Sequence, residues 1–91
     1  MPVSVVIPEE LIRYSDGHKQ IEIEASTIDG LLTELFTKFP DLKLRLIDER
    51  GHFYPYIPAF LNDQKLPLSG TCRHRLKDGD QLAFVVIASG G

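Results

Sequence analysis

The run of residues 81–88, QLAFVVIA, limits the fold more than any other part of the chain. Read with a period of two, it has two apolar faces, formed by Leu82, Phe84 and Val86 and by Ala83, Val85 and Ile87. A strand that is apolar on both faces is typical of a central strand covered on both sides. We therefore expect the rest of the chain to supply neighbouring strands, a helix for one face and a cover for the other.

Two earlier segments alternate as strands do. Residues 3–12 begin with Val3, Val5 and Ile7 at alternate positions, and residues 21–25 alternate apolar with charged side chains. Residues 15–18 between them read Ser-Asp-Gly-His, a composition that favours a turn. This pattern predicts a hairpin whose second strand is a charged edge of the sheet.

A helix is predicted over residues 27–39. Its apolar residues step by three and four along one face: Ile28, Leu31, Leu32, Leu35, Phe36 and Phe39. Thr27 is the expected N-cap, because a threonine hydroxyl can accept a hydrogen bond from a backbone N–H of the first turn. Pro40 ends the helix, since it has no N–H to continue the pattern.

The segments between this helix and the last strand are less regular. Residues 41–54 fit either a short strand or a helical turn, and residues 56–61 predict a strand, with Pro58 favouring an edge or a bulge. A turn at residues 62–65 and an irregular connection follow, and the Asp78-Gly79 pair makes a tight turn before the last strand. The order predicts an α+β fold: a mixed sheet of four to five strands with one main helix packed on one face. The first and last strands would pair in parallel at its centre.

Size and composition narrow the class of protein. The 91 residues allow one domain, which we place at residues 1–88, followed by a flexible tail at residues 89–91. The net charge of −3 argues against nucleic acid as a partner, and no apolar run is long enough to cross a membrane. Cys72 is the sole cysteine, which suits a reducing compartment, so we expect a cytoplasmic protein.

The chain ends in Gly90-Gly91, and residues 76–84, LKDGDQLAF, precede this ending. Together with the element order, these motifs resemble the MoaD/ThiS family of sulfur carriers, which have the β-grasp, ubiquitin-like fold. The resemblance covers essentially the whole chain. Within the family, residues 52–63, HFYPYIPAFLND, are similar to the carriers that serve the biosynthesis of cysteine or related amino acids.

The resemblance implies a carrier protein and not an enzyme. An ATP-dependent adenylating enzyme of the MoeB/ThiF type would activate the Gly91 carboxylate, sulfur would replace AMP to give a thiocarboxylate, and a synthase would accept the sulfur. A sulfurtransferase supplying the sulfur, or a protease trimming residues after Gly91, would be further partners. No bound cofactor and no metal are implied. The sequence ends at Gly91, so it is either the naturally mature form of the carrier or a truncated one.

The residues themselves explain why a tail would suit this chemistry. Residues 88–91, if extended, reach roughly 13 Å at about 3.3 Å per residue. Glycine carries no side chain that would block a narrow channel, so Ser89, Gly90 and Gly91 are the residues expected to enter partner active sites. Two alternatives stay open: a ubiquitin-like modifier that forms isopeptide bonds through Gly91, and a plain interaction module. A molybdopterin-synthase small subunit is the alternative within the family.

A docking surface is expected on the second face of the sheet, formed by Phe60 with either Phe84 or the pair Val85 and Ile87. The alternative is that this face is covered by Tyr54, Tyr56 and residues 41–54. The basic run Arg73, His74, Arg75 and Lys77 could steer an acidic partner or be a solvated loop. Cys72 lacks the further ligands of a metal site and is read as structural.

Overall fold

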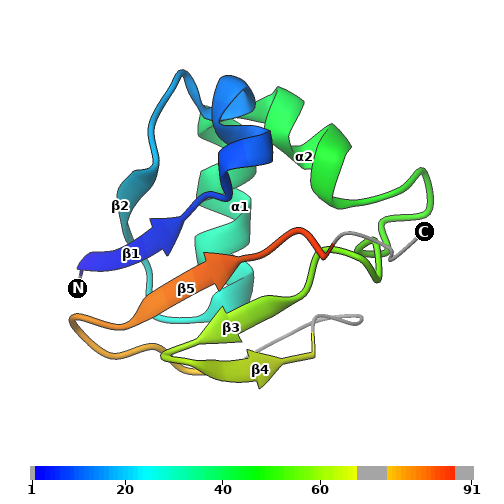
Figure 1. Cartoon of the computed structure of the whole chain (residues 1–91). Helices are drawn as coiled ribbons and strands as arrows, with labels where there is room; N and C mark the ends of the chain where they lie inside the picture. Colours follow the sequence, from blue (N-terminus) through cyan, green and yellow to red (C-terminus); the bar gives the residue numbers. More distant parts are fainter. Residues whose placement is uncertain (1, 68–73, 88–91) are drawn as a thin grey trace.

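The structure is a computed structural model that describes residues 2–67 and 74–87. Its elements in chain order are strand β1 (Pro2–Val6), the 3-10 helix η1 (Glu9–Ser15), strand β2 (Gln20–Glu24), helices α1 (Ile28–Lys38) and α2 (Pro40–Leu46), and strands β3 (Ala59–Leu61), β4 (Gln64–Leu66) and β5 (Gln81–Phe84). Figure 1 shows the sheet with α1 packed behind it and with η1 and α2 together at one end.

The five strands form one mixed sheet in the order β2-β1-β5-β3-β4. The β1 and β5 strands run parallel, with Val5 opposite Leu82, and the other three pairs are antiparallel. The predicted fold class is confirmed, including the parallel pairing of the first and last strands at the centre and the edge position of residues 20–24. This arrangement is the β-grasp fold.

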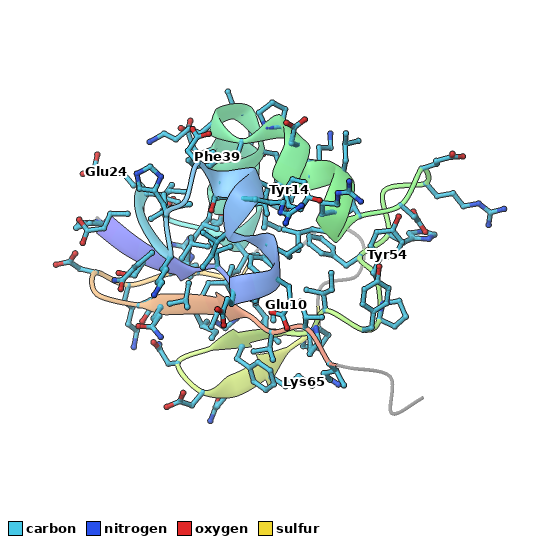
Figure 2. All side chains as sticks on the ribbon, turned by 45° about the horizontal axis from the view of Figure 1, so that its top comes forward. Glu10, Tyr14, Glu24, Phe39, Tyr54 and Lys65 are labelled. Carbon is cyan, nitrogen blue, oxygen red and sulfur yellow. The ribbon has the colours of Figure 1, made fainter. Side chains whose placement is uncertain are left out.

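The core lies between the sheet and α1. Val3, Val5 and Leu82 are fully buried from the sheet side, and Leu31 and Leu35 are fully buried from the helix side. Figure 2 shows the same layering: Tyr14 and Phe39 lie beside the helices, whereas Lys65 lies on β4 at the opposite side of the molecule. The alternation in the strands and the three-to-four spacing in the helix therefore face each other, as their periods require.

Helix α1 begins and ends where the sequence predicts. The Thr27 hydroxyl accepts a hydrogen bond from the Gly30 N–H at 3.1 Å, so Thr27 is the N-cap. The helix stops at Lys38, and Pro40 begins the separate helix α2. The ambiguous segment 41–54 is therefore helix as far as Leu46, because a proline at the first position already has the φ angle that a helix needs. Its remainder is irregular, with an isolated bridge between Ile47 and Phe53.

The first strand is shorter than predicted. It ends at Val6 instead of Ile12, and residues 9–15 form η1. Pro8 precedes this turn of helix, and its carbonyl accepts the Leu11 N–H at 2.9 Å. The turn buries Leu11 and Ser15, and the Ser15 hydroxyl donates to the Ile12 and His18 carbonyls. Satisfied backbone groups and a buried leucine therefore outweigh strand propensity here.

Two further strand boundaries differ from the prediction. Residues 64–66, expected as turn and connection, form β4, and the reversal before it is confined to Asn62 and Asp63, which both have positive φ. Such angles suit a two-residue hairpin turn. Pro58 precedes β3, which lies between β5 and β4 and is therefore neither an edge strand nor bulged at that residue.

The second face of β5 is less covered than predicted. Leu82 and Phe84 are buried against the helix layer, but Val85 and Ile87 on the other face are 41% and 52% exposed. The expectation that both faces would be buried is wrong, because α1 packs on one face of the sheet only. In the described residues, no helix has the length and apolar character needed to cross a membrane.

Replacing Thr27 with alanine tests the cap. The substitution removes the acceptor for the Gly30 N–H, so we expect the free energy of unfolding in urea to fall by about 1 kcal/mol. Thr33→Ala is the matched control: its hydroxyl donates to the Asp29 carbonyl on the exposed side of the same helix, and its loss should change stability by at most about 0.5 kcal/mol. Equal losses in both variants would contradict the capping role.

Candidate functional site

The predicted reactive residues, Ser89, Gly90 and Gly91, lie outside the described residues, as does the boundary between domain and tail. The last described residue is Ile87, so what the structure describes is the base of the predicted tail. Residues 85–87 follow β5 directly. The candidate site is therefore the surface from which the chain leaves the sheet.

The base of the tail is attached to the segment before β3. The Val85 N–H donates to the Pro58 carbonyl at 3.0 Å, and the Ile87 N–H donates to the Tyr56 carbonyl at 2.9 Å. Figure 1 shows the chain after β5 running alongside this segment. Residues 85–87 are thus tied to the fold, although they lie beyond the assigned strand.

The outward face of the sheet carries apolar side chains next to this base. Ala83 lies opposite Phe60 on one side and Val6 on the other, and all three are half-buried. Val85 and Ile87 continue this face toward the end of the chain. The predicted docking residues Phe60, Val85 and Ile87 therefore lie on one face. We call Val6, Phe60, Ala83, Val85 and Ile87 the outer apolar face.

Phe84 does not belong to the outer apolar face. It is 2% exposed, points into the core, and stacks on Phe53 with ring centroids 6.4 Å apart. Its place in the predicted docking surface is wrong, because strand alternation sends it to the side opposite Val85. The ring centroid of Phe53 also lies 6.4 Å from that of Phe36 on α1. This contact holds Phe53 on the helix side of the sheet.

The predicted alternative cover fails for a related reason. Phe53 packs on the helix side, and Val85 and Ile87 remain 41% and 52% exposed, so residues 41–54 do not close this face. Tyr54 and Tyr56 stack on each other with centroids 5.3 Å apart, and Tyr56 is itself 48% exposed. The two tyrosines therefore extend the exposed surface beside the tail base instead of closing it.

The start of β5 is held by the Asp-Gly-Asp turn at residues 78–80. Gly79 has φ +87°, a conformation that glycine adopts readily, and its N–H donates to the Pro2 carbonyl. The Ser4 N–H donates to the Asp80 carbonyl at 2.9 Å. The Asp-Gly-Asp motif therefore serves to set the register of β5 against β1.

Asp80 also ties this turn to the neighbouring hairpin. Its carboxylate accepts the Lys77 backbone N–H at 2.7 Å and the Asn62 side-chain N–H at 2.9 Å. The side-chain oxygen Oδ1 of Asn62 in turn accepts the Gln81 N–H. The Lys77 hydrogen bond, followed by that of Asn62, holds the pKa of Asp80 below its usual value. Sequence reasoning placed Asn62 in a turn and gave no signal that it would contact Asp80, 18 positions away.

The basic run lies at the far end of β5 from the tail base. His74, Arg75 and Lys77 line an open cavity of about 360 Å³ together with Lys65 and the Asp80 carboxylate. Arg73 and Cys72 fall outside the described residues. Within residues 2–67 and 74–87, no three histidine, cysteine, aspartate or glutamate side chains gather as the ligands of one metal ion would.

Comparison with known proteins agrees with this geometry. The model of the ThiS family matches residues 5–91, which includes the end of β1, strands β2 to β5 and the terminal glycines. The chain has the β-grasp fold and belongs to the ThiS family.

Individual relatives match over the full length. The sulfur carrier proteins CysO of Mycobacterium tuberculosis and Mycobacterium bovis are 25% identical over 93 aligned positions, covering all of both chains. A chain of the Amycolatopsis orientalis BexX/CysO complex is 28% identical, with a TM-score of 0.81 over 98% of this chain and 99% of that one. SAMP1 from Haloferax volcanii, at 21% identity and a TM-score of 0.83 over the whole of both chains, shares the fold.

The Asp80 network predicts a pH dependence. Because the native pKa is lowered, the charged carboxylate stabilises the fold above the ordinary aspartate value of about 4, and this contribution is lost as the pH falls through the lower native value. Asp80→Asn should therefore flatten the fall in the free energy of unfolding below about pH 4. Asp78→Asn in the same turn controls for the loss of one negative charge. Identical pH profiles for wild type and Asp80→Asn would contradict this role.

Proposed function

We propose that this chain is a sulfur carrier protein whose Gly91 carboxylate is converted to a thiocarboxylate and used as a sulfur donor. One observation carries the proposal: the central strand β5, held between β1 and β3, leads directly to a tail base four residues before the terminal Gly91. Membership of the ThiS family, with a match that extends through Gly91, supports the same reading.

The chemistry requires activation because a carboxylate is a poor electrophile. A carboxylate oxygen of Gly91 attacks the α-phosphorus of ATP, and pyrophosphate leaves. A sulfur nucleophile then attacks the carbonyl carbon of the acyl-adenylate, and AMP leaves. An ATP-dependent adenylating enzyme of the MoeB/ThiF type catalyses these steps, and ATP binds to that enzyme. The carrier supplies the acyl group, so it is a co-substrate and not an enzyme.

The proposed sulfur acceptor is a synthase of cysteine or a related sulfur metabolite. The full-length relatives named CysO are the support for this branch of the family. A molybdopterin-synthase small subunit and a protein modifier that forms isopeptide bonds through Gly91 are the alternatives. Loading of the chain with sulfur distinguishes a carrier from a plain interaction module whose tail does not react. Lysine-linked adducts in cells would identify a modifier.

The outer apolar face is the proposed docking surface. Val85 and Ile87 are exposed apolar residues directly beside the tail base, and Phe60 continues the face on β3. A partner that takes up a tail of roughly 13 Å, at about 3.3 Å per residue, must approach this base closely. Its contact would bury side chains that now meet water, which favours association.

Deleting Gly91, or adding an alanine after it, tests the central claim. Both changes remove the glycyl carboxylate from its position, so we expect no loading with sulfur. The purified chain is incubated with ATP, a sulfide source and the adenylating enzyme of the MoeB/ThiF type from the same organism. The intact mass of the chain is then measured. Wild type should gain the mass difference between sulfur and oxygen. The thermal unfolding temperature of both variants should equal that of wild type. Loading of either variant with sulfur would contradict the proposal.

A charge on the outer apolar face tests the docking surface. Val85→Asp keeps the backbone N–H but puts a carboxylate where an apolar contact is proposed, so kcat/KM for loading should fall about tenfold, equivalent to about 1.4 kcal/mol. Leu44→Asp is the control, because Leu44 is 70% exposed on α2, away from the sheet. Equal effects of the two substitutions would argue against docking on the outer apolar face.

A further inference from the structure

We propose that residues 56–58 act as a positioning element that fixes where the reactive tail begins. The inference rests on the proposed function, and it assigns a role to residues with no part in the chemistry. Its basis is the pair of hydrogen bonds that Val85 and Ile87 donate to this segment.

These two bonds continue the β3–β5 pairing in register. In the assigned ladder, Ala59 lies opposite Phe84 and Leu61 opposite Leu82. In the same register, the pair that follows Ala59 and Phe84 is Pro58 with Val85, and two residues further along each strand Tyr56 lies opposite Ile87. These are the two pairs that the hydrogen bonds join. The pairing of the central strand thus reaches Ile87, three residues beyond the assigned end of β5.

Pro58 explains why the assigned strand ends early. A hydrogen-bonded antiparallel pair normally exchanges two N–H to carbonyl bonds. Pro58 has no N–H, so it accepts from Val85 and cannot donate in return. The ladder is therefore one-sided at this pair, and Val85 is held by a single bond instead of two.

The segment that holds the tail base is itself firmly placed. Ile57 is 3% exposed, and its N–H donates to the Tyr54 carbonyl at 3.1 Å. The Tyr54 N–H donates to the Leu46 carbonyl at the end of α2, and Phe53 stacks on Phe84. Figure 2 shows Tyr54 on the segment that leaves α2. The positioning element is thus fastened both to a helix and to the central strand.

The consequence for function is a short tail with a defined start. With Ile87 attached, four residues, 88–91, are left to reach a partner's active site; with residues 85–87 released, seven would have to be ordered. Each residue ordered in advance spares the partner the entropy of fixing its backbone. The positioning element therefore lowers the KM for the activating enzyme and leaves the chemical step, and hence kcat, unchanged.

Two substitutions at Ile87 separate its N–H from its side chain. Ile87→Ala removes the side chain and keeps the donor, whereas Ile87→Pro removes both. We expect the KM for loading to be about fivefold higher for Ile87→Pro than for Ile87→Ala, the factor that corresponds to one ordinary hydrogen bond. The kcat values should agree within about twofold, since the chemical groups are the same. Equal KM values would overturn the proposal, provided that thermal unfolding shows both variants to be folded.

Pro58→Ala changes the other pair, Pro58 with Val85, and should strengthen the attachment of the tail base. The new N–H can donate to the Val85 carbonyl and complete the two-bond pair, so amide exchange of Val85 and Ile87 should slow, and the KM should not exceed that of wild type. A higher KM with slower exchange would mean that loading requires release of the tail base, which would overturn the proposal.

Failure of the proposed function looks different from failure of this inference. If wild type gains no sulfur when incubated with ATP, the adenylating enzyme and sulfide, the carrier function fails. In that event, amide exchange still tests whether the tail base is attached to residues 56–58. Protected amides at Val85 and Ile87 in wild type would uphold the attachment, and exchange at the rate of an unfolded chain would refute it. If wild type is loaded, the ratio of KM values between Ile87→Pro and Ile87→Ala decides the role in positioning.

Discussion

The parallel pairing of β1 with β5 is the contact on which the other elements depend. It places Val5 opposite Leu82 and so joins two strands that are separated by nearly the whole chain. Parallel neighbours cannot be joined by a tight turn, so the intervening chain must cross the sheet. Helix α1 supplies the main part of that crossing, and β2 and β3 add the strands on either side. The buried core forms where α1 packs against this central pair.

This central position also gives β5 its functional meaning. Strands lie on both sides of it, Phe84 fixes its inner face, and the Asp80 and Asn62 network fixes its start. At its other end the bonds to the Tyr56 and Pro58 carbonyls carry the pairing beyond the regular strand. The fold therefore holds the central strand firmly along its length and presents the end of the chain from one defined place. A firmly held strand that leads to the end of the chain suits a protein whose proposed reactive group is its own C-terminus.

The parts that were predicted correctly are those whose signals are local and agree with one another. Residues 27–40 combine a cap, a helical period and a terminating proline, and the structure has helix α1 over residues 28–38. The errors have physical causes that involve other parts of the chain. Residues 9–15 became a 3-10 helix because it buries Leu11 and satisfies Ser15. The regular strand stops at Phe84 because the partner of the next residue is a proline, which no reading of residues 81–88 alone would reveal.

The sequence by itself determined the class of fold, the central place of the last strand, the identity of the capping and turn residues, and the terminal glycines that mark the proposed chemistry. These follow from periodicity and from residues whose backbone preferences act over a few positions. The tertiary structure decided which apolar residues face outward, that Asn62 reaches Asp80, and that Tyr56 and Pro58 hold the base of the tail. Each of these depends on the register between strands, because a contact between residues far apart in the chain exists only once the sheet has brought them together.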